Sequence, residues 1–252
     1  MDWKKLSTTK ISEVYKRLFL NQCYLCSSSN TKQPHTLCHH CHNGFSKNTI
    51  SCQRCKRSTY IADSLCGQCQ ASLPPYHKCI APYRFEGIVK NLIHSVKFNQ
   101  GNHYIRPLTY LLSKHLIDTY AENDWPEQIL YVPSHPSRIK ERGFCQTQVM
   151  TVQLANLLQQ HLGKQSPTRP TQNPITKVRH TQAQHSLSRK ERLNTPKNSY
   201  SVQAPIAKHV ALFDDVMTTG STIETCTKLL LTAGAERVDI WVIARTPDKE
   251  HD

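Results

Sequence analysis

Eight of the eleven cysteines in this 252-residue chain stand in Cys-x-x-Cys pairs, a residue type and spacing that can bind a metal ion. The gaps between successive pairs are 11, 10 and 10 residues. A Cys-x-x-Cys turn places two thiolates on one side, and two such turns complete a four-sulfur zinc site. We therefore expect two structural zinc ions, with the ligands Cys23, Cys26, Cys38, Cys41, Cys52, Cys55, Cys66 and Cys69.

A disulfide framework and a redox Cys-x-x-Cys are the competing interpretations of these pairs. The N-terminal sequence lacks the apolar segment and cleavage site of a secretory signal, and disulfides are rare in the cytosol. Four evenly spaced copies also do not resemble a thioredoxin active site. Sequential pairing, 23/26 with 38/41 and 52/55 with 66/69, closes the shortest loops. A cross-brace pairing stays open.

A second pattern, VALFDDVMTTGST (210–222), has two adjacent acids at the end of an apolar strand, followed by a short turn and a helix. Backbone N–H groups at a helix N-terminus favour an anion, and the hydroxyl groups add donors. The acids would repel a phosphate, so we expect them to accept bonds from ligand hydroxyls or to hold Mg²⁺ through water. A ribose 5-phosphate carries both a phosphate for the turn and hydroxyl groups for the acids. The candidate residues are Asp214, Asp215, Thr218, Thr219, Gly220, Ser221 and Thr222.

The elements that position these acids belong to an alternating pattern of strands and helices. The spacing of apolar residues predicts strands at 129–133, 210–216 and 237–245 and helices at 87–99, 106–120, 145–162 and 220–233. Strand–helix–strand units with short links form parallel sheets. The fold class expected is α/β, a parallel sheet with helices on both faces, preceded by a small zinc-ribbon module.

Three segments are expected along the chain. Residues 1–22 carry one apolar stripe and predict an amphipathic helix. Residues 23–75 form the double zinc ribbon, which ends at Leu73-Pro74-Pro75, and residues 76–252 form the α/β domain. Within that domain, residues 164–199 are polar and basic and predict a long flexible loop.

The net charge of +14 is concentrated in two blocks, +8 over residues 1–80 and +9 over 135–198. Such blocks favour a polyanionic partner or a phosphate-bearing ligand. No stretch approaches 18 uninterrupted apolar residues, so we expect no membrane insertion and a cytoplasmic location.

At residues 210–222 the sequence resembles the type I phosphoribosyltransferase family, whose signature binds phosphoribosyl pyrophosphate (PRPP). Together with the cysteine-rich N-terminus, the blocks VPSHPSRIKERGFCQ (132–146) and KVRHTQAQHSLSRKERLN (177–194) are similar to the ComF family of competence proteins. The resemblance implies a pyrophosphate loop with Arg138, Lys140 and Arg142. It implies a catalytic loop with Arg179 and Arg192, which would act with Asp214 and Asp215. Cys145 stands where the family usually has Asn.

The resemblance implies a PRPP-binding protein that acts in natural transformation on single-stranded DNA in the cytosol, with competence-machinery proteins as further partners. The alternative is an active phosphoribosyltransferase, an enzyme of the glycosyltransferase class, that transfers phosphoribosyl from PRPP to an unknown acceptor. A zinc-stabilised adaptor with a vestigial pocket is a third hypothesis, and the intact acid pair and turn argue against it.

Overall fold

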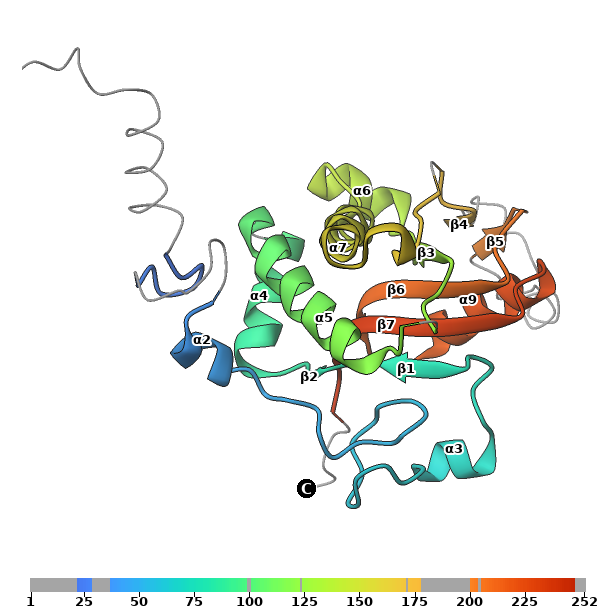
Figure 1. Cartoon of the computed structure of the whole chain (residues 1–252), viewed down its shortest axis with the longest axis horizontal. Helices are drawn as coiled ribbons and strands as arrows, with labels where there is room; N and C mark the ends of the chain where they lie inside the picture. The colour runs from blue at the N-terminus through green and yellow to red at the C-terminus, as the bar shows by residue number, and fades with distance from the viewer. Residues whose placement is uncertain are drawn as a thin grey trace, which may run out of the picture.

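A five-stranded sheet, in which every strand pair is parallel, forms the centre of the computed structural model (Figure 1). The strand order is β1-β7-β6-β3, and β2 pairs with β7 beyond the end of β1. The strands are β1 (Lys78–Ile80), β2 (Tyr83–Arg84), β3 (Gln128–Tyr131), β6 (His209–Met217) and β7 (Arg237–Arg245).

The structure describes residues 22–28, 37–98, 101–122, 124–170, 172–177, 200–203 and 205–247. The helix predicted for residues 1–22 lies outside the described residues except for Gln22. Most of the segment 164–199 lies outside them as well. Its described part contains the 3-10 helix η3 (Gly163–Gln165) and strand β4 (Ile175–Lys177), which pairs antiparallel with β5 (Tyr200–Val202).

Helices cover both faces of the sheet, which confirms the predicted fold class. One face packs on α4 (Gly87–Phe98), α5 (Ile105–Thr119) and α7 (Gln146–Leu162), and the other on α9 (Ser221–Thr232). Successive side chains of a strand point to opposite faces. In β6, Ala211 and Phe213 accordingly join the first core, whereas Val210 and Leu212 join the second.

The predicted helices and strands agree with these elements to within two residues at each end. Apolar periodicity located them because each buries one face or lies wholly inside the core. The sequence did not predict β1, β2 or the short helix α6 (Pro136–Arg142), whose lengths are too small for a period to emerge. A 3-10 helix, η2 (Asn102–Tyr104), precedes α5.

The cysteine-rich segment contains two short helices, α2 (His39–Asn43) and α3 (Gly67–Ala71), and lies along the β1–β2 edge of the sheet. Arg84 donates its backbone N–H to Ser46 O at 2.9 Å, and Lys47 forms an antiparallel bridge with Tyr83. Pairing of this kind covers a sheet edge that would otherwise expose unpaired backbone groups. The boundary at residue 75 stays a prediction.

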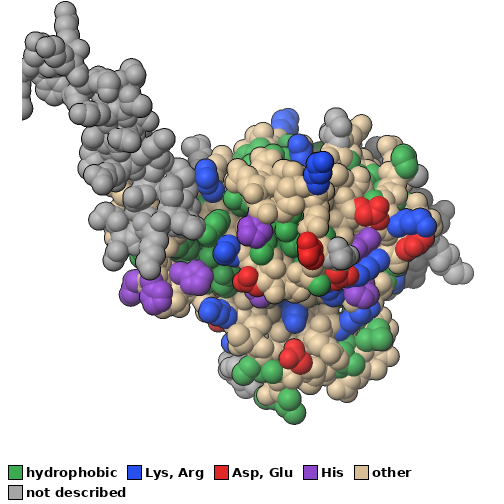
Figure 2. All heavy atoms as spheres, viewed as in Figure 1, with side chains coloured by type: hydrophobic (Ala, Val, Ile, Leu, Met, Phe, Trp, Pro, Cys, Tyr) green, Lys and Arg blue, Asp and Glu red, His purple; other side chains and the backbone are tan. Residues whose placement is uncertain are grey.

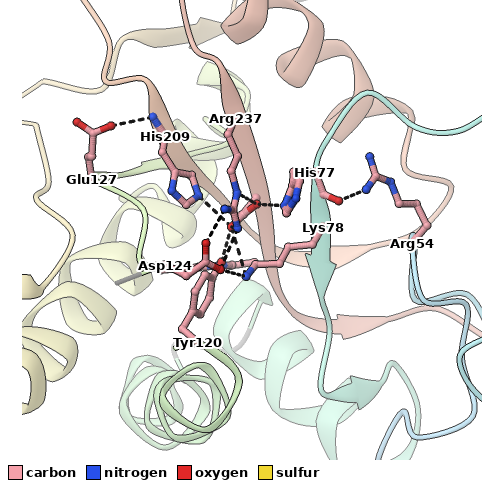
Figure 3. Close-up of polar contacts among 10 residues, drawn as sticks. Arg54, His77, Lys78, Tyr120, Asp124, Glu127, His209 and Arg237 are labelled. Atoms are coloured by element: carbon pink, nitrogen blue, oxygen red, sulfur yellow. Dashed lines mark hydrogen bonds and ion pairs between the residues drawn. The ribbon is translucent and has the colours of Figure 1, made fainter. Parts of the chain in front are cut away.

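The amino edge of the sheet is held together by a fully buried carboxylate, Asp239. Figure 3 labels four of the residues that surround it, which are His77, Tyr120, His209 and Arg237. It accepts hydrogen bonds from Tyr120 Oη at 2.7 Å and from Arg237 at 3.1 and 3.2 Å, and it lies 3.0 Å from His209 Nε2 and 3.2 Å from His77 Nδ1. Burial alone would raise the pKa of Asp239, but these hydrogen bonds outweigh it and lower the pKa.

None of the described helices has the length and hydropathy needed to cross a bilayer.

Candidate functional site

The two adjacent acids lie at the carboxyl end of β6, the edge at which parallel α/β sheets bind ligands. Asp215 is only 4% exposed. Its Oδ2 lies 2.7 Å from Lys97 Nζ, at the end of α4, and accepts a hydrogen bond from Gln146 Nε2, at the start of α7. Asp214 is half-buried and accepts the backbone N–H of Asp215 at 2.9 Å. Asp215 is therefore neutralised within the protein.

Among the described residues, no cation forms an ion pair with Asp214. Desolvation by the surrounding atoms and the neighbouring charge of Asp215 raise the pKa of Asp214 well above its usual value. A ligand that offers hydroxyl donors or a hydrated cation would stabilise the ionised form of a carboxyl group in this environment.

Gln146 links the acid pair to the block that the sequence suggested as a pyrophosphate loop. Arg142 NH1 donates to Gln146 Oε1 at 2.7 Å, and the Arg142 guanidinium stands 5.0 Å from the centre of the Phe98 ring. Arg138 instead pairs with Glu141 at 3.0 Å on the exposed surface of α6, where Lys140 is also exposed. Of the three predicted basic residues, the described contacts join only Arg142 to the acids.

Cys145 occupies the position before Gln146 and is buried. Its Sγ donates to Ser134 Oγ at 3.6 Å and lies 3.3 Å from Thr147 Oγ1. Burial raises the pKa of this thiol, but hydrogen bonds with Thr147 and Ser134 outweigh burial and lower it overall. The side chain contacts the turn after β3 and has no described contact with Asp214 or Asp215.

The turn that joins β6 to α9, residues 218–222, has the form of an anion site. Gly220 has φ +92°, and a Cβ there would meet Met217 Cε at 2.7 Å, so the position favours glycine on both counts. Thr219 Oγ1 lies 3.1 Å from Ser221 Oγ, at the first residue of the 12-residue helix α9. The turn thus brings hydroxyl groups to the N-terminus of α9, where the N–H groups of a helix favour an anion, and it follows the acid pair directly in the chain. Arg179 and Arg192 lie outside the described residues.

The eight paired cysteines form two groups in the sequential arrangement, Cys23/26/38/41 and Cys52/55/66/69, and within each group the sulfurs lie within 4.8 Å of one another. A tetrahedral site with Zn–S bonds of about 2.3 Å has sulfurs about 3.8 Å apart. The distances from Cys26 to Cys38 and from Cys55 to Cys66 are both 3.6 Å, so the groups fit zinc. All eleven cysteines are free thiols, which argues against a disulfide framework.

Both groups repeat one local design. The first pair of each group lies on a tight turn whose fifth residue, Ser27 or Lys56, has φ +57°, and the second pair begins a short helix, α2 or α3. Hydrogen bonds with Ser28 lower the pKa of Cys26 to about 6, which favours the thiolate that a metal requires. The cysteine groups are therefore consistent with two structural metal sites.

A cleft of about 1440 Å³ opens between the first cysteine group and α5. Four lysines line it, together with histidines of α2, which Figure 2 shows gathered on the surface, and a single acid, Asp118. The lining lysines are Lys47, Lys56, Lys78 and Lys114. Lys78 pairs with Asp124 at 3.0 Å, but no described acid pairs with the other three. Burial lowers the pKa of His115, on the α5 wall.

Three residues that matter for this geometry were missed by sequence reasoning: Lys97, Gln146 and Arg245. Gln146 stood inside a quoted motif but carried no separate signal. Lys97 lies near the end of an amphipathic helix, where its position in the sequence is that of an ordinary solvent-facing lysine. Arg245 ends an apolar strand, and a charge at such a strand end was the available signal, as it was for Asp214.

Residues 150–252, which include β6, the turn and β7, match the family model described as a phosphoribosyl transferase domain. The fold and this match indicate the class: after the two cysteine groups, the chain has a domain whose C-terminal part, residues 150–252, matches phosphoribosyl transferase domains.

The chain is also similar, over most of its length, to curated competence and DNA-utilization proteins. It is 29% identical to competence protein F of Haemophilus influenzae over 231 residues, which cover 89% of this chain and 96% of that protein. It is 28% identical to the DNA utilization protein YhgH of Salmonella typhimurium over 227 residues, with the same coverage. With competence protein ComFC of Streptococcus pneumoniae the identity is 26%, over 83% of this chain and 87% of that protein. The resemblance to the ComF family is thereby confirmed.

Proposed function

We propose that this chain binds PRPP with Mg²⁺ at the carboxyl edge of its sheet and acts in DNA uptake on single-stranded DNA in the cytosol. The observation that carries the PRPP assignment is the contiguity of Asp214, Asp215 and the turn 218–222 at the end of β6. The turn offers donors to a 5-phosphate, and the acids offer acceptors to ribose hydroxyls or to water bound to Mg²⁺. Arg142 is linked to Asp215 through Gln146, which supports a role for its guanidinium in binding a second anionic group of the same ligand.

The role in DNA uptake is supported by the names of the similar proteins, competence protein F and DNA utilization protein. The cleft beside α5 supports the contact with DNA, because three of its lysines pair with no described acid and a basic groove can follow the phosphate backbone of a single strand. Its volume exceeds the range of about 300–1,000 Å³ that is usual for small-molecule pockets. We place the single strand in this cleft, apart from the acid pair, and expect competence-machinery proteins as partners.

We further propose that both cysteine groups hold zinc and that the chain divides into residues 1–22, 23–75 and 76–252. Four thiolates fill the coordination sphere of each zinc, so the metal has a structural role and contributes to the folding of a segment with a small core of its own. The proposed division does not make the parts independent, because Cys52 and Cys69 share a hydrophobic core with α9 and β7.

Calorimetric titration with PRPP and Mg²⁺ tests the proposal. The unmodified chain should bind, and Asp214→Asn should abolish binding while the thermal unfolding temperature is kept. Asp215→Asn should also abolish binding, but it removes the partner of Lys97 and will lower stability, so Asp214 is the cleaner test. The matched control is Asp118→Asn, an exposed acid on α5. Unchanged PRPP affinity in Asp214→Asn would refute the assignment.

The alternative function is the transfer of phosphoribosyl from PRPP to an acceptor. It differs from binding alone because transfer releases pyrophosphate, which can be measured. The acid pair and the turn are complete in this chain, which keeps that chemistry open. If pyrophosphate is released from PRPP at a rate that depends on Asp214 and on an added acceptor, the chain is a transferase. Binding without release supports the role of PRPP as a bound ligand.

A further inference from the structure

Arg245, the last residue of β7, is a buried cation that joins two distant segments of the chain. It is 3% exposed. Its Nε donates to Cys55 O at 3.2 Å, and its NH1 donates to Met217 O at 2.9 Å and to Thr218 O. Cys55 belongs to the second cysteine group, and Thr218 begins the phosphate-binding turn. One guanidinium therefore binds the backbone of a metal site and the backbone of the turn at the same time.

The packing around Arg245 brings the same two segments into contact. Met217 lies in one hydrophobic cluster with all four cysteines of the second group, and Cys79 Sγ lies 3.9 Å from Met217 Sδ. A gap of only about 20 Å³ is left where the second cysteine group meets the end of β6. Its lining includes Cys55 and Cys69 of the cysteine group, together with Met217 and Thr219. The first cysteine group packs with Leu25 and Leu37, and none of its described contacts reaches the turn.

The contact of Arg245 with the second cysteine group should depend on the metal bound there, because the metal changes the charge near the guanidinium. No described acid pairs with Arg245, whose hydrogen-bond partners are the carbonyl oxygens of residues 55, 217 and 218. A buried cation is costly unless charge of the opposite sign is near. Four thiolates around one Zn²⁺ leave a net negative charge, and the thiolates of Cys55 and its partners would lie beside the guanidinium. The metal-loaded group thus stabilises Arg245 where it stands and fixes the Cys55 carbonyl that it binds.

We propose that the second cysteine group, when loaded with metal, positions the phosphate-binding turn through Arg245. Loss of that metal weakens PRPP binding, whereas loss of the first metal leaves it unchanged. Arg245 is a positioning residue, because it holds the carbonyls of residues 217 and 218 from behind the turn. The consequence for PRPP rests on the proposed function, but the effect on the turn itself does not.

The test compares the full chain with Cys66→Ser, which breaks the second group, and with Cys38→Ser, which breaks the first. Each variant should lose one metal ion by mass spectrometry. Amide hydrogen exchange of a peptide covering residues 216–224 should become faster in Cys66→Ser and stay unchanged in Cys38→Ser. PRPP affinity should fall about 5- to 150-fold in Cys66→Ser, the usual range of coupling between two sites. It should be unchanged in Cys38→Ser.

Arg245→Lys separates positioning from general destabilisation. Lys keeps the charge, but its three donors sit on one nitrogen, whereas Arg245 uses Nε for one segment and NH1 for the other. We expect it to weaken PRPP binding as Cys66→Ser does. In the double variant, Cys66→Ser should add little, because the connection is already broken. Additive losses, or equal losses in Cys38→Ser and Cys66→Ser, would overturn the proposal.

Failure of the proposed function gives a different result. If the unmodified chain does not bind PRPP, the assignment of the ligand is wrong, and the exchange measurement alone decides the coupling. Faster exchange at residues 216–224 only after loss of the second metal then supports the inference. Unchanged exchange in Cys66→Ser overturns it whatever the result with PRPP.

Discussion

Asp214 and Asp215 are neighbours in sequence, yet their surroundings give them different electrostatic roles. Asp215 is balanced by Lys97 and by Gln146, so it is held in one position before any ligand arrives. Asp214 carries the raised pKa, because the site desolvates it and Asp215 repels a second negative charge. A ligand that supplies positive charge or hydroxyl donors would therefore favour the ionised form of Asp214.

The pKa of Asp214 should fall when the charge of Asp215 is removed. In Asp215→Asn the repulsion disappears and only the desolvation remains to raise it, while Lys97 continues to lower it. Carboxyl carbon shifts in a pH titration by NMR measure this directly. Asp118→Asn serves as the control and should leave the titration of Asp214 where it was. An unaltered Asp214 titration in Asp215→Asn would contradict the pairwise origin of the shift.

Gln146→Ala should lower the free energy of unfolding by about 1–3 kcal/mol, the cost of removing one partner from a buried group. The variant deprives Asp215 of a donor and separates Arg142 from the acid pair. Urea denaturation measures the loss. Gln148→Ala, on the exposed side of the same helix, should cost far less. Equal effects of the two substitutions would mean that the contact with Asp215 contributes nothing.

At the scale of elements, the amino edge of the sheet depends on Asp239 at the start of β7. Tyr120 donates to it from the residue that follows α5, and Trp241 Nε1 donates to Tyr120 Oη at 2.9 Å. Tyr120→Phe leaves both partners short of a bond and should cost about 1–3 kcal/mol of unfolding free energy at pH 7. Tyr60→Phe, at a fully exposed position, is the control and should be neutral.

The lowered pKa of Asp239 also predicts how the stability of the sheet depends on pH. A depressed pKa in the folded state contributes stability that is present above the unfolded value of about 3.9 and is lost as the pH falls through the folded value. The unmodified chain should therefore lose stability in acid below about pH 4. In Asp239→Asn this acid-dependent part should shrink. Acid titration followed by circular dichroism compares the two, and identical profiles would contradict the prediction.

At the scale of the whole molecule, purified protein should contain two zinc ions per chain, because two separate groups of four sulfurs lie at metal-binding distances. Mass spectrometry of protein prepared without a metal-binding tag gives the stoichiometry. Removal of both ions with a chelator should unfold the cysteine-rich segment, whose own core is small. One zinc ion or none would refute the prediction.

Binding of single-stranded DNA should weaken steeply with salt and depend little on sequence. For single strands the log–log slope is about −0.7 per phosphate neutralised. Replacement of the cleft residues Lys47, Lys56 and Lys114 by Gln should reduce the slope by about 2. Replacement of Lys164, Lys208 and Lys228, which do not line the cleft, removes the same charge and should change the slope less. Fluorescence anisotropy measures both, and equal slopes would place the strand elsewhere.

The sequence by itself determined the features whose causes are local. Cys-x-x-Cys spacing predicts a turn, and an apolar run followed by two acids and a Thr-Thr-Gly segment predicts a strand, a turn and a helix. Four long helices and three strands followed from their periodicity. Each of these depends on residues within about ten positions of one another, so the pattern is visible without the fold.

Only the tertiary structure decided which of these parts meet. Lys97 and Gln146 reach Asp215 from helices that are 118 and 69 residues away in sequence, and Arg245 reaches Cys55 across 190 residues. It also decided that the cysteine groups pair sequentially and that the second, not the first, contacts the segment that leads into the turn 218–222. Such contacts arise from the packing of surfaces whose relative positions depend on the whole core, and no local spacing encodes them.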